Sequence, residues 1–211
     1  MSATDADFIH SFHASTHGST YDSPTTFVLL HGTGGDETSL LPLMRHIAPG
    51  SATLAMRGRS LDEGFARWFR RQTAVTFDQA HIRAEAEALD RFLKAAMKRY
   101  DIEPETCVFL GFSNGANMIG AMLESCPHTI RNAILLRPMQ VLDAVDPVNL
   151  TGVQVFMTNG AQDPFGPYAP PLMEHLERAG ASVTSHMLPA GHDLILEDAR
   201  LCRSWLDERG L

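Results

Sequence analysis

The sequence predicts an α/β fold with a mostly parallel central sheet and helices on both faces. Short apolar runs rich in β-branched residues alternate along the chain with longer stretches of helical period, a pattern typical of repeated strand–helix–strand units. The runs FVLL at 27–30 and AILL at 133–136 are continuously apolar, which indicates strands covered on both faces. The chain shows no internal repeat, low-complexity tract or linker, so we expect one domain over residues 1–211.

The strands are expected where the apolar runs are short. An edge strand is predicted over 7–13 (DFIHSFH), because apolar and polar residues nearly alternate there. The central strands are predicted, in chain order, at 26–31, 52–57, 107–112, 132–137, 153–159 and 182–188.

Helices are predicted between these strands. The first covers 38–47 and follows Asp36 and Thr38, two residues suited to the N-cap position. The longest covers 78–100. Its apolar residues recur at heptad-like spacing and its other face is charged, so it is expected to lie on the surface of the sheet. The remaining helices are predicted at 114–125, 168–179 and 195–209.

Composition and charge exclude several classes of function. The chain has 211 residues, of which 44% are hydrophobic and 20% are charged, as in ordinary soluble globular proteins. Its net charge of −8 disfavours nucleic acid or an anionic membrane as a partner, because both require a basic surface. No apolar run approaches the ~20 residues of a membrane helix, and the N-terminus has acids where a secretory signal has lysines. We therefore expect a cytoplasmic protein.

Neither a metal site nor a disulfide framework is expected. The three cysteines are an odd number without metal-like spacing, and we interpret them as small buried side chains. His10, His13 and His17 could suggest a metal site, but they lack a carboxylate or cysteine ligand at suitable spacing. We favour structural roles for these histidines.

The motif GFSNG at 111–115 suggests a nucleophile. It follows the predicted strand 107–112 and precedes a helix, which is the context in which G-x-S-x-G places a serine on a sharp turn. Gly111 and Gly115 would prevent side chains from colliding at this turn. The alternative is an ordinary polar turn, because a bare G-x-S-x-G also occurs by chance. The strand–turn–helix context favours Ser113 as the nucleophile.

A base and an acid follow Ser113 in the chain. His192, in LPAGHDL, comes directly after the last predicted strand, and Asp163, in TNGAQDPFG, follows strand 153–159 through a short turn. The order serine, aspartate, histidine is that of one of the known triad arrangements. Asp143 and Asp146 are the alternative acids, at a longer distance from their strand.

The oxyanion of a tetrahedral intermediate also requires donors. We expect the backbone N–H of Asn114, directly after the nucleophile, and that of Thr33, in the glycine-rich segment LLHGTGGDE at 29–37. This segment could instead be a phosphate-binding loop. However, no Gly-Lys-Ser/Thr follows, and Glu37 stands where a dinucleotide fingerprint requires a glycine.

In order and spacing, LLHGTGGDE, GFSNGAN, GAQDP and PAGHDL resemble the small carboxylesterase/phospholipase family of α/β-hydrolases, which includes the acyl-protein thioesterases. The segment MRGRSLDEGFARWFRR at 56–71 is further similar to a bacterial subgroup of predicted hydrolases, some of them linked to quinone resistance. The resemblance runs from about Phe27 to Leu206. It implies an α/β-hydrolase fold, an ester or thioester as a small-molecule substrate, no cofactor, and often a homodimer.

The resemblance also assigns roles. Ser113, Asp163 and His192 would form the catalytic triad, and Thr33 and Asn114 the oxyanion hole. The segment 56–71 would bring Arg57, Trp68 and Phe69 to the substrate pocket, although its aromatic residues could equally pack over the edge of the sheet. Asn114 replaces the glutamine common in the thioesterases, so a lipidated-protein substrate is not assumed.

No cap domain is expected over the site. Larger hydrolases of this fold commonly insert a helical cap after the sixth strand, but here only 138–152, a turn-rich segment, is available, and it is too short for a core of its own. We therefore predict a serine esterase with a shallow site. A dienelactone-hydrolase-like enzyme is less similar because its nucleophile is cysteine. The alternative from another class is a small-molecule binding protein that has kept the fold and lost the chemistry.

Overall fold

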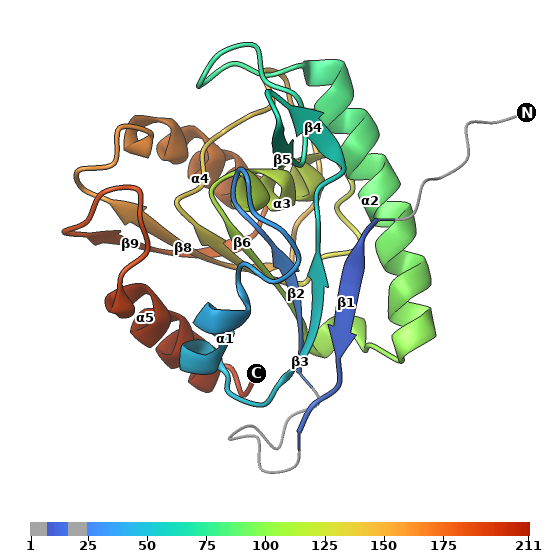
Figure 1. Ribbon diagram of the computed structural model, residues 1–211. Coiled ribbons are helices and arrows are strands. Elements are labelled where there is room, and N and C mark those ends of the chain that lie inside the picture. The colour runs from blue at the N-terminus through green and yellow to red at the C-terminus, as the bar shows by residue number, and fades with distance from the viewer. Residues whose placement is uncertain (1–7, 17–24) are drawn as a thin grey trace, which may run out of the picture.

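The computed structural model describes residues 8–16 and 25–211, and a seven-stranded sheet runs through the middle of this part (Figure 1). The strand order is β1-β3-β2-β6-β7-β8-β9. Only the edge strand β1 (His10–His13) is antiparallel to its neighbour. The parallel strands are β2 (Thr26–Leu30), β3 (Ala52–Met56), β6 (Cys107–Phe112), β7 (Asn132–Leu136), β8 (Gln154–Gly160) and β9 (Ser182–Leu188).

Helices cover both faces of this sheet (Figure 1). On one face lie α2 (Gln79–Tyr100), α3 (Asn114–Ser125) and α4 (Ala169–Arg178); on the other lie α1 (Leu41–Ile47) and α5 (Leu196–Asp207). Short 3₁₀ turns, η1 (Pro104–Thr106) and η2 (Gly166–Tyr168), connect some of the elements. Each face has its own apolar core, and β2, β6, β7 and β8 are buried between them almost throughout. The predicted α/β class with a mostly parallel sheet is confirmed.

Most predicted boundaries agree with the structure to within one residue, and three differ by more. The first helix begins at Leu41 rather than at residue 38. The Asp36 carboxylate instead accepts hydrogen bonds from Thr38 and from the Ser39 hydroxyl, which closes a turn before the helix, and Pro42 stands in the first helical turn. The last helix ends at Asp207, two residues early. The edge strand begins at His10 rather than at residue 7, and residue 7 itself lies outside the described residues.

A hairpin was missed within 56–71. Strands β4 (Ser60–Asp62) and β5 (Phe65–Arg67) pair in antiparallel fashion. The two residues between them, Glu63 and Gly64, both have positive φ, at 54° and 82°, which is the geometry of a two-residue hairpin turn. The hairpin lies above the carboxyl ends of the central strands (Figure 1), and Gly34 N–H donates to the Ala66 carbonyl at 2.8 Å.

No helix or strand forms between β7 and β8, so segment 138–152 adds no cap over the sheet. The predicted absence of a cap domain is confirmed for this segment. Within residues 8–16 and 25–211, none of the helices has both the length and the apolar character needed to cross a membrane.

Candidate active site

Ser113 stands on a strained turn between β6 and α3. Its φ of 51° and ψ of −116° lie outside the usual regions for a residue with a side chain. A Cβ at Gly111 would lie 2.6 Å from the backbone nitrogen of Ala116, and a Cβ at Gly115 would clash with the Leu30 carbonyl. The G-x-S-x-G spacing is therefore a steric requirement, because glycine is the only residue that lets α3 pack this close to β2 and β6.

The structure brings Ser113, His192 and Asp163 together. His192 Nδ1 lies 2.8 Å from Asp163 Oδ2, and His192 Nε2 lies 2.8 Å from Ser113 Oγ. Since the carboxylate can only accept, Nδ1 carries the ring proton and Nε2 is free to accept from the Ser113 hydroxyl. The side chain of Asp163 is 3% exposed and that of His192 27% exposed. The aspartate is thus shielded from water while the histidine faces the site.

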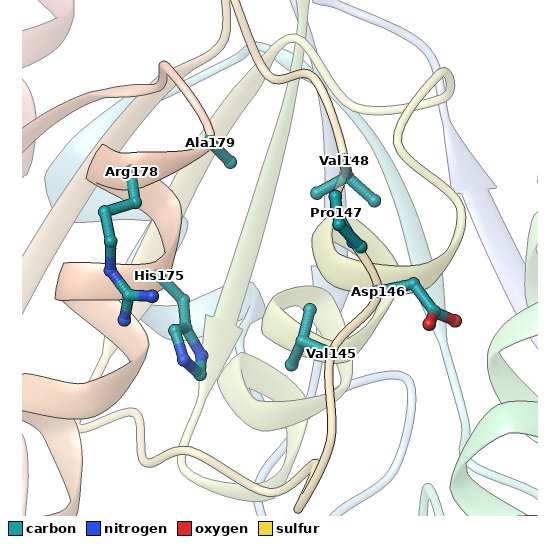
Figure 2. A pocket seen from close by; sticks show the side chains of 7 residues that line it. All are labelled: Val145, Asp146, Pro147, Val148, His175, Arg178 and Ala179. Atoms are coloured by element: carbon teal, nitrogen blue, oxygen red, sulfur yellow. The ribbon is translucent and has the colours of Figure 1, made fainter.

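Asp163 is itself held in place, and the alternative acids are not near His192. The second oxygen of Asp163 accepts from Phe165 N–H at 2.8 Å. Asp146 lies on segment 145–148, beside a separate hollow of about 260 Å³ that His175 and Arg178 of α4 also line (Figure 2). This hollow shares no lining residue with the cavity at Ser113. Asp143 contacts Gln79 through its backbone N–H.

The His31 ring holds the glycine-rich segment after β2 in place through hydrogen bonds. This buried ring accepts from Gly58 N–H at Nε2, at 3.0 Å, so its Nδ1–H donates to the Gly32 carbonyl, at 2.6 Å. Burial lowers the pKa of His31, in agreement with a neutral ring that accepts a hydrogen bond. Trp68 Nε1–H donates to the carbonyl of His31 at 2.9 Å.

Thr33 and Asn114 both line the cavity that contains Ser113. Asn114 is the first residue of α3, so its N–H has no acceptor within the helix. The side-chain oxygen of Asn114 accepts from Trp68 N–H at 2.8 Å. The Thr33 hydroxyl accepts from Arg67 Nη1 at 3.1 Å. These contacts hold Thr33 and Asn114 in place at the cavity.

The cavity at Ser113 has a volume of about 240 Å³. It lies between the glycine-rich segment, the residues after the hairpin and the loop that carries His192. It is lined by Thr33, Arg67, Arg71, Ala74, Phe77, Ser113, Asn114, Asn117, Arg137, Met139, Phe165 and His192.

Comparison with known proteins identifies the family. Although no family model matches the chain, it is 31% identical over 188 residues to "Putative hydrolase MhqD" of Bacillus subtilis, covering 88% of this chain and 94% of that protein. A carboxylesterase from Mesorhizobium loti is 40% identical, with a TM-score of 0.89 and 97% of each chain covered. The Bacillus cereus carboxylesterase is 32% identical, with a TM-score of 0.88, over 96% of this chain and 95% of that one. The chain belongs to the carboxylesterase family of α/β-hydrolases. It is a hydrolase that acts on esters.

In this esterase the three residues expected to line the substrate pocket lie elsewhere. Trp68 and Phe69 are fully buried in the core beneath the site, where their rings pack against Phe8 and Phe77. Arg57 forms a two-pronged ion pair with Glu37, at 2.6 and 3.0 Å. None of the three lines the cavity at Ser113. Arg67, the last residue of β5, and Arg71 line the cavity instead.

A buried arginine behind the histidine was also missed. Arg137 follows β7 with a φ of 54°, and its guanidinium makes a two-pronged ion pair with Asp198 at 2.8 and 2.9 Å, both side chains being 0% exposed. It also donates to the carbonyls of Gly191 and Asp193, on either side of His192. The only signal in the sequence was a charged residue directly after a continuously apolar run.

The residues described by the structure contain no group of three His, Cys, Asp or Glu side chains arranged to hold a metal ion. His10 bonds instead to the Phe8 carbonyl and the Tyr100 hydroxyl, at 2.8 and 2.9 Å. His13 lies 3.2 Å from the Ser11 hydroxyl. His17 falls outside the described residues.

Proposed function

We propose that this esterase cleaves carboxylic esters of small molecules through an acyl-enzyme formed on Ser113. The observation that carries the proposal is the pair of 2.8 Å hydrogen-bond distances that join Ser113, His192 and Asp163 in one chain. A serine hydroxyl is a poor nucleophile unless a base accepts its proton, and this arrangement supplies the base and its orienting acid.

In the first half of the reaction Ser113 Oγ attacks the ester carbonyl carbon while His192 Nε2 takes the hydroxyl proton. The Asp163 carboxylate stabilises the imidazolium that forms. The negative charge on the former carbonyl oxygen is stabilised by the N–H groups of Thr33 and Asn114, and one such donor contributes about 10²–10³ in rate. The intermediate then collapses, and His192 gives its proton to the leaving alcohol.

In the second half a water molecule attacks the acyl group on Ser113. His192 again accepts a proton, now from the water, and the same two N–H groups stabilise the oxyanion. Collapse of this second intermediate releases the carboxylic acid and returns the proton from His192 to Ser113 Oγ. The carboxylesterases among the similar structures support an oxygen ester as the substrate.

The test is covalent labelling. A fluorophosphonate probe should modify the wild-type protein stoichiometrically, with the adduct on the peptide that contains Ser113, and Ser113→Ala should abolish both labelling and ester hydrolysis. Ser125→Ala, at the end of the same helix, is the matched control and should be labelled normally. An adduct elsewhere, or none in a folded protein, would favour the alternative of a binding protein without catalysis.

A further inference from the structure

The cavity at Ser113 is cationic in an otherwise acidic protein. Its lining contains Arg67, Arg71 and Arg137 and no aspartate or glutamate, whereas the chain as a whole has a net charge of −8. Buried positive charge is costly unless an anion accompanies it. The three arginines differ in how completely protein carboxylates and hydrogen-bond acceptors pair with them.

Arg137 is fully paired within the protein. Its guanidinium is fully buried in the ion pair with Asp198, and it also donates to Thr158 and to two backbone carbonyls. Its charge and its hydrogen bonds are thus accounted for within the protein. It belongs to the support of the His192 loop.

Arg67 is different. Its side chain is only 6% exposed, yet among the described residues its single hydrogen bond is the one from Nη1 to the Thr33 hydroxyl. Its Nε is buried without a hydrogen-bond partner, and the nearest carboxylate oxygen, Asp62 Oδ2, lies 3.7 Å from it. A guanidinium has five N–H donors, so most of its hydrogen-bonding capacity is unused at a position beside the reacting serine.

Arg71 adds a second positive charge to the same cavity. Burial and the neighbouring Arg71 lower the pKa of Arg67, while Asp62 and Glu63 on the hairpin act in the opposite sense. Arg71 is partly exposed and paired with Glu63, itself largely exposed. Two arginines that repel each other in the lining of one cavity form a site that an anion stabilises. Guanidinium groups also match carboxylates in geometry.

We propose that the preferred substrate is an ester that also carries a carboxylate, a few bonds from the scissile carbonyl, and that Arg67 and Arg71 bind this carboxylate. Half-esters of short dicarboxylic acids are one form of this class, and acyl esters of hydroxy acids are the other. The proposal rests on the proposed ester hydrolysis at Ser113 for its catalytic meaning. Binding of the carboxylate can be measured separately from catalysis.

The kinetic experiment uses matched pairs in which an isopropyl group replaces the carboxylate. On the acyl side, monoethyl succinate is compared with ethyl 4-methylpentanoate; on the alcohol side, O-acetylglycolate is compared with isobutyl acetate. We expect kcat/KM to favour the anionic member of at least one pair by about tenfold or more, because charge-assisted hydrogen bonds are the strong ones. The pair that shows the preference tells which part of the ester faces Arg67.

Variants then locate the preference. Arg67→Gln should remove most of it, Arg67→Lys should keep part of it, and Arg71→Gln should reduce it less, since Arg71 is more exposed. Arg178→Gln, which makes the same change of charge beside the separate hollow, should leave it unchanged. Thermal unfolding of each variant checks that the fold is intact.

The outcomes separate the two proposals. Equal kcat/KM for both members of both pairs, or a preference unchanged in Arg67→Gln, overturns the carboxylate site while leaving ester hydrolysis intact. If no ester is cleaved at all, the proposed function fails, and binding decides the inference. In that case monoethyl succinate and O-acetylglycolate are titrated calorimetrically into Ser113→Ala. Binding of either that weakens about tenfold or more in Ser113→Ala/Arg67→Gln supports the site, and no binding overturns it.

Discussion

At the scale of single residues, the backbone of Ser113 carries a conformational cost that its surroundings offset. A non-glycine residue in this region costs about 1–3 kcal/mol. Ser113 N–H donates to Leu136 O at 2.8 Å, and Asn117 N–H donates to Ser113 O at 2.9 Å, so both backbone polar groups are bonded. The strained backbone of Ser113 lies at the turn after β6, where the hydroxyl projects from the end of the sheet.

The fold opposes the protonation of His31. Burial lowers its pKa, so near and below the usual value of 6.5 the unfolded chain binds a proton that the folded chain does not. The free energy of unfolding should therefore decrease as the pH falls through this region, by at most about 1.4 kcal/mol per pH unit from this residue. Chemical denaturation at pH 7.5, 6.5 and 5.5 measures this dependence.

His31→Gln is the control for this prediction. Its amide oxygen can still accept from Gly58 N–H, but it does not titrate, so the loss of stability on acidification should be smaller than in the wild type. All other titrating groups are common to both proteins. Parallel pH dependences for wild type and variant would show that His31 is not responsible.

At the scale of elements, the β4–β5 hairpin and Arg137 both position segments of the site that are distant from them in the sequence. The hairpin carries Arg67 and binds the glycine-rich segment through Gly34 N–H. Arg137 connects the end of β7 to the start of α5, where the Asp198 carboxylate accepts from Ile195 N–H at 2.9 Å. The loop that carries His192 lies between β9 and α5, and the Arg137 guanidinium holds it through the carbonyls of Gly191 and Asp193.

Removing Arg137 should be strongly destabilising. Arg137→Met leaves Asp198 buried without its partner, which costs about 3–5 kcal/mol. Asp198→Leu in the Arg137→Met background should cost much less than Asp198→Leu alone, because the uncompensated charge is already there. Both kcat/KM and the denaturation midpoint should fall in Arg137→Met, since the His192 loop loses two hydrogen bonds.

A double-mutant cycle measures this coupling, with Arg57→Met as the control. The side chain of Arg57 is 37% exposed and paired with Glu37, so its removal should change stability much less than removal of the fully buried Arg137. Strictly additive effects of the Arg137 and Asp198 substitutions would mean that the two side chains do not act as a pair.

At the scale of the whole molecule, the site lies at the carboxyl ends of the strands with no cap above it. The cavity of about 240 Å³ is smaller than the roughly 300–1,000 Å³ usual for ligand pockets. Each methylene that an acyl chain buries adds about 0.8 kcal/mol of binding, and few can be buried here. For p-nitrophenyl esters from acetate to palmitate, kcat/KM should therefore rise over the short chains and level off by the eight-carbon acid.

A second hollow beside this cavity could hold a longer acyl chain. It has a volume of about 570 Å³, it shares Thr33 with the cavity, and Leu40, Leu43 and Leu194 line it. If kcat/KM rises steadily beyond the eight-carbon acid, long acyl chains extend into this hollow, and the shallow-site prediction is wrong.

By itself, the sequence determined the chain order of the central-sheet strands and of the helices, and the positions of Ser113, Asp163 and His192 after their strands. These features are encoded locally. Apolar periodicity defines the elements, and the glycines around Ser113 reflect the steric limits of a turn within a few residues. The carboxyl ends of neighbouring parallel strands meet at one edge of a sheet, so three separate loops could be expected to converge there.

Only the tertiary structure decided which other side chains reach the site. Segment 56–71 contains three aromatic residues and several arginines. Its sequence does not tell which of them face inward, because the hairpin register and the packing of the segment on the core determine that. Trp68 and Phe69 pack into the core, and Arg67 faces the cavity. Arg137 likewise has a role only because Asp198, 61 residues away, lies beside it in the fold. Such contacts depend on packing between residues far apart in the chain, and local sequence patterns carry no information about it.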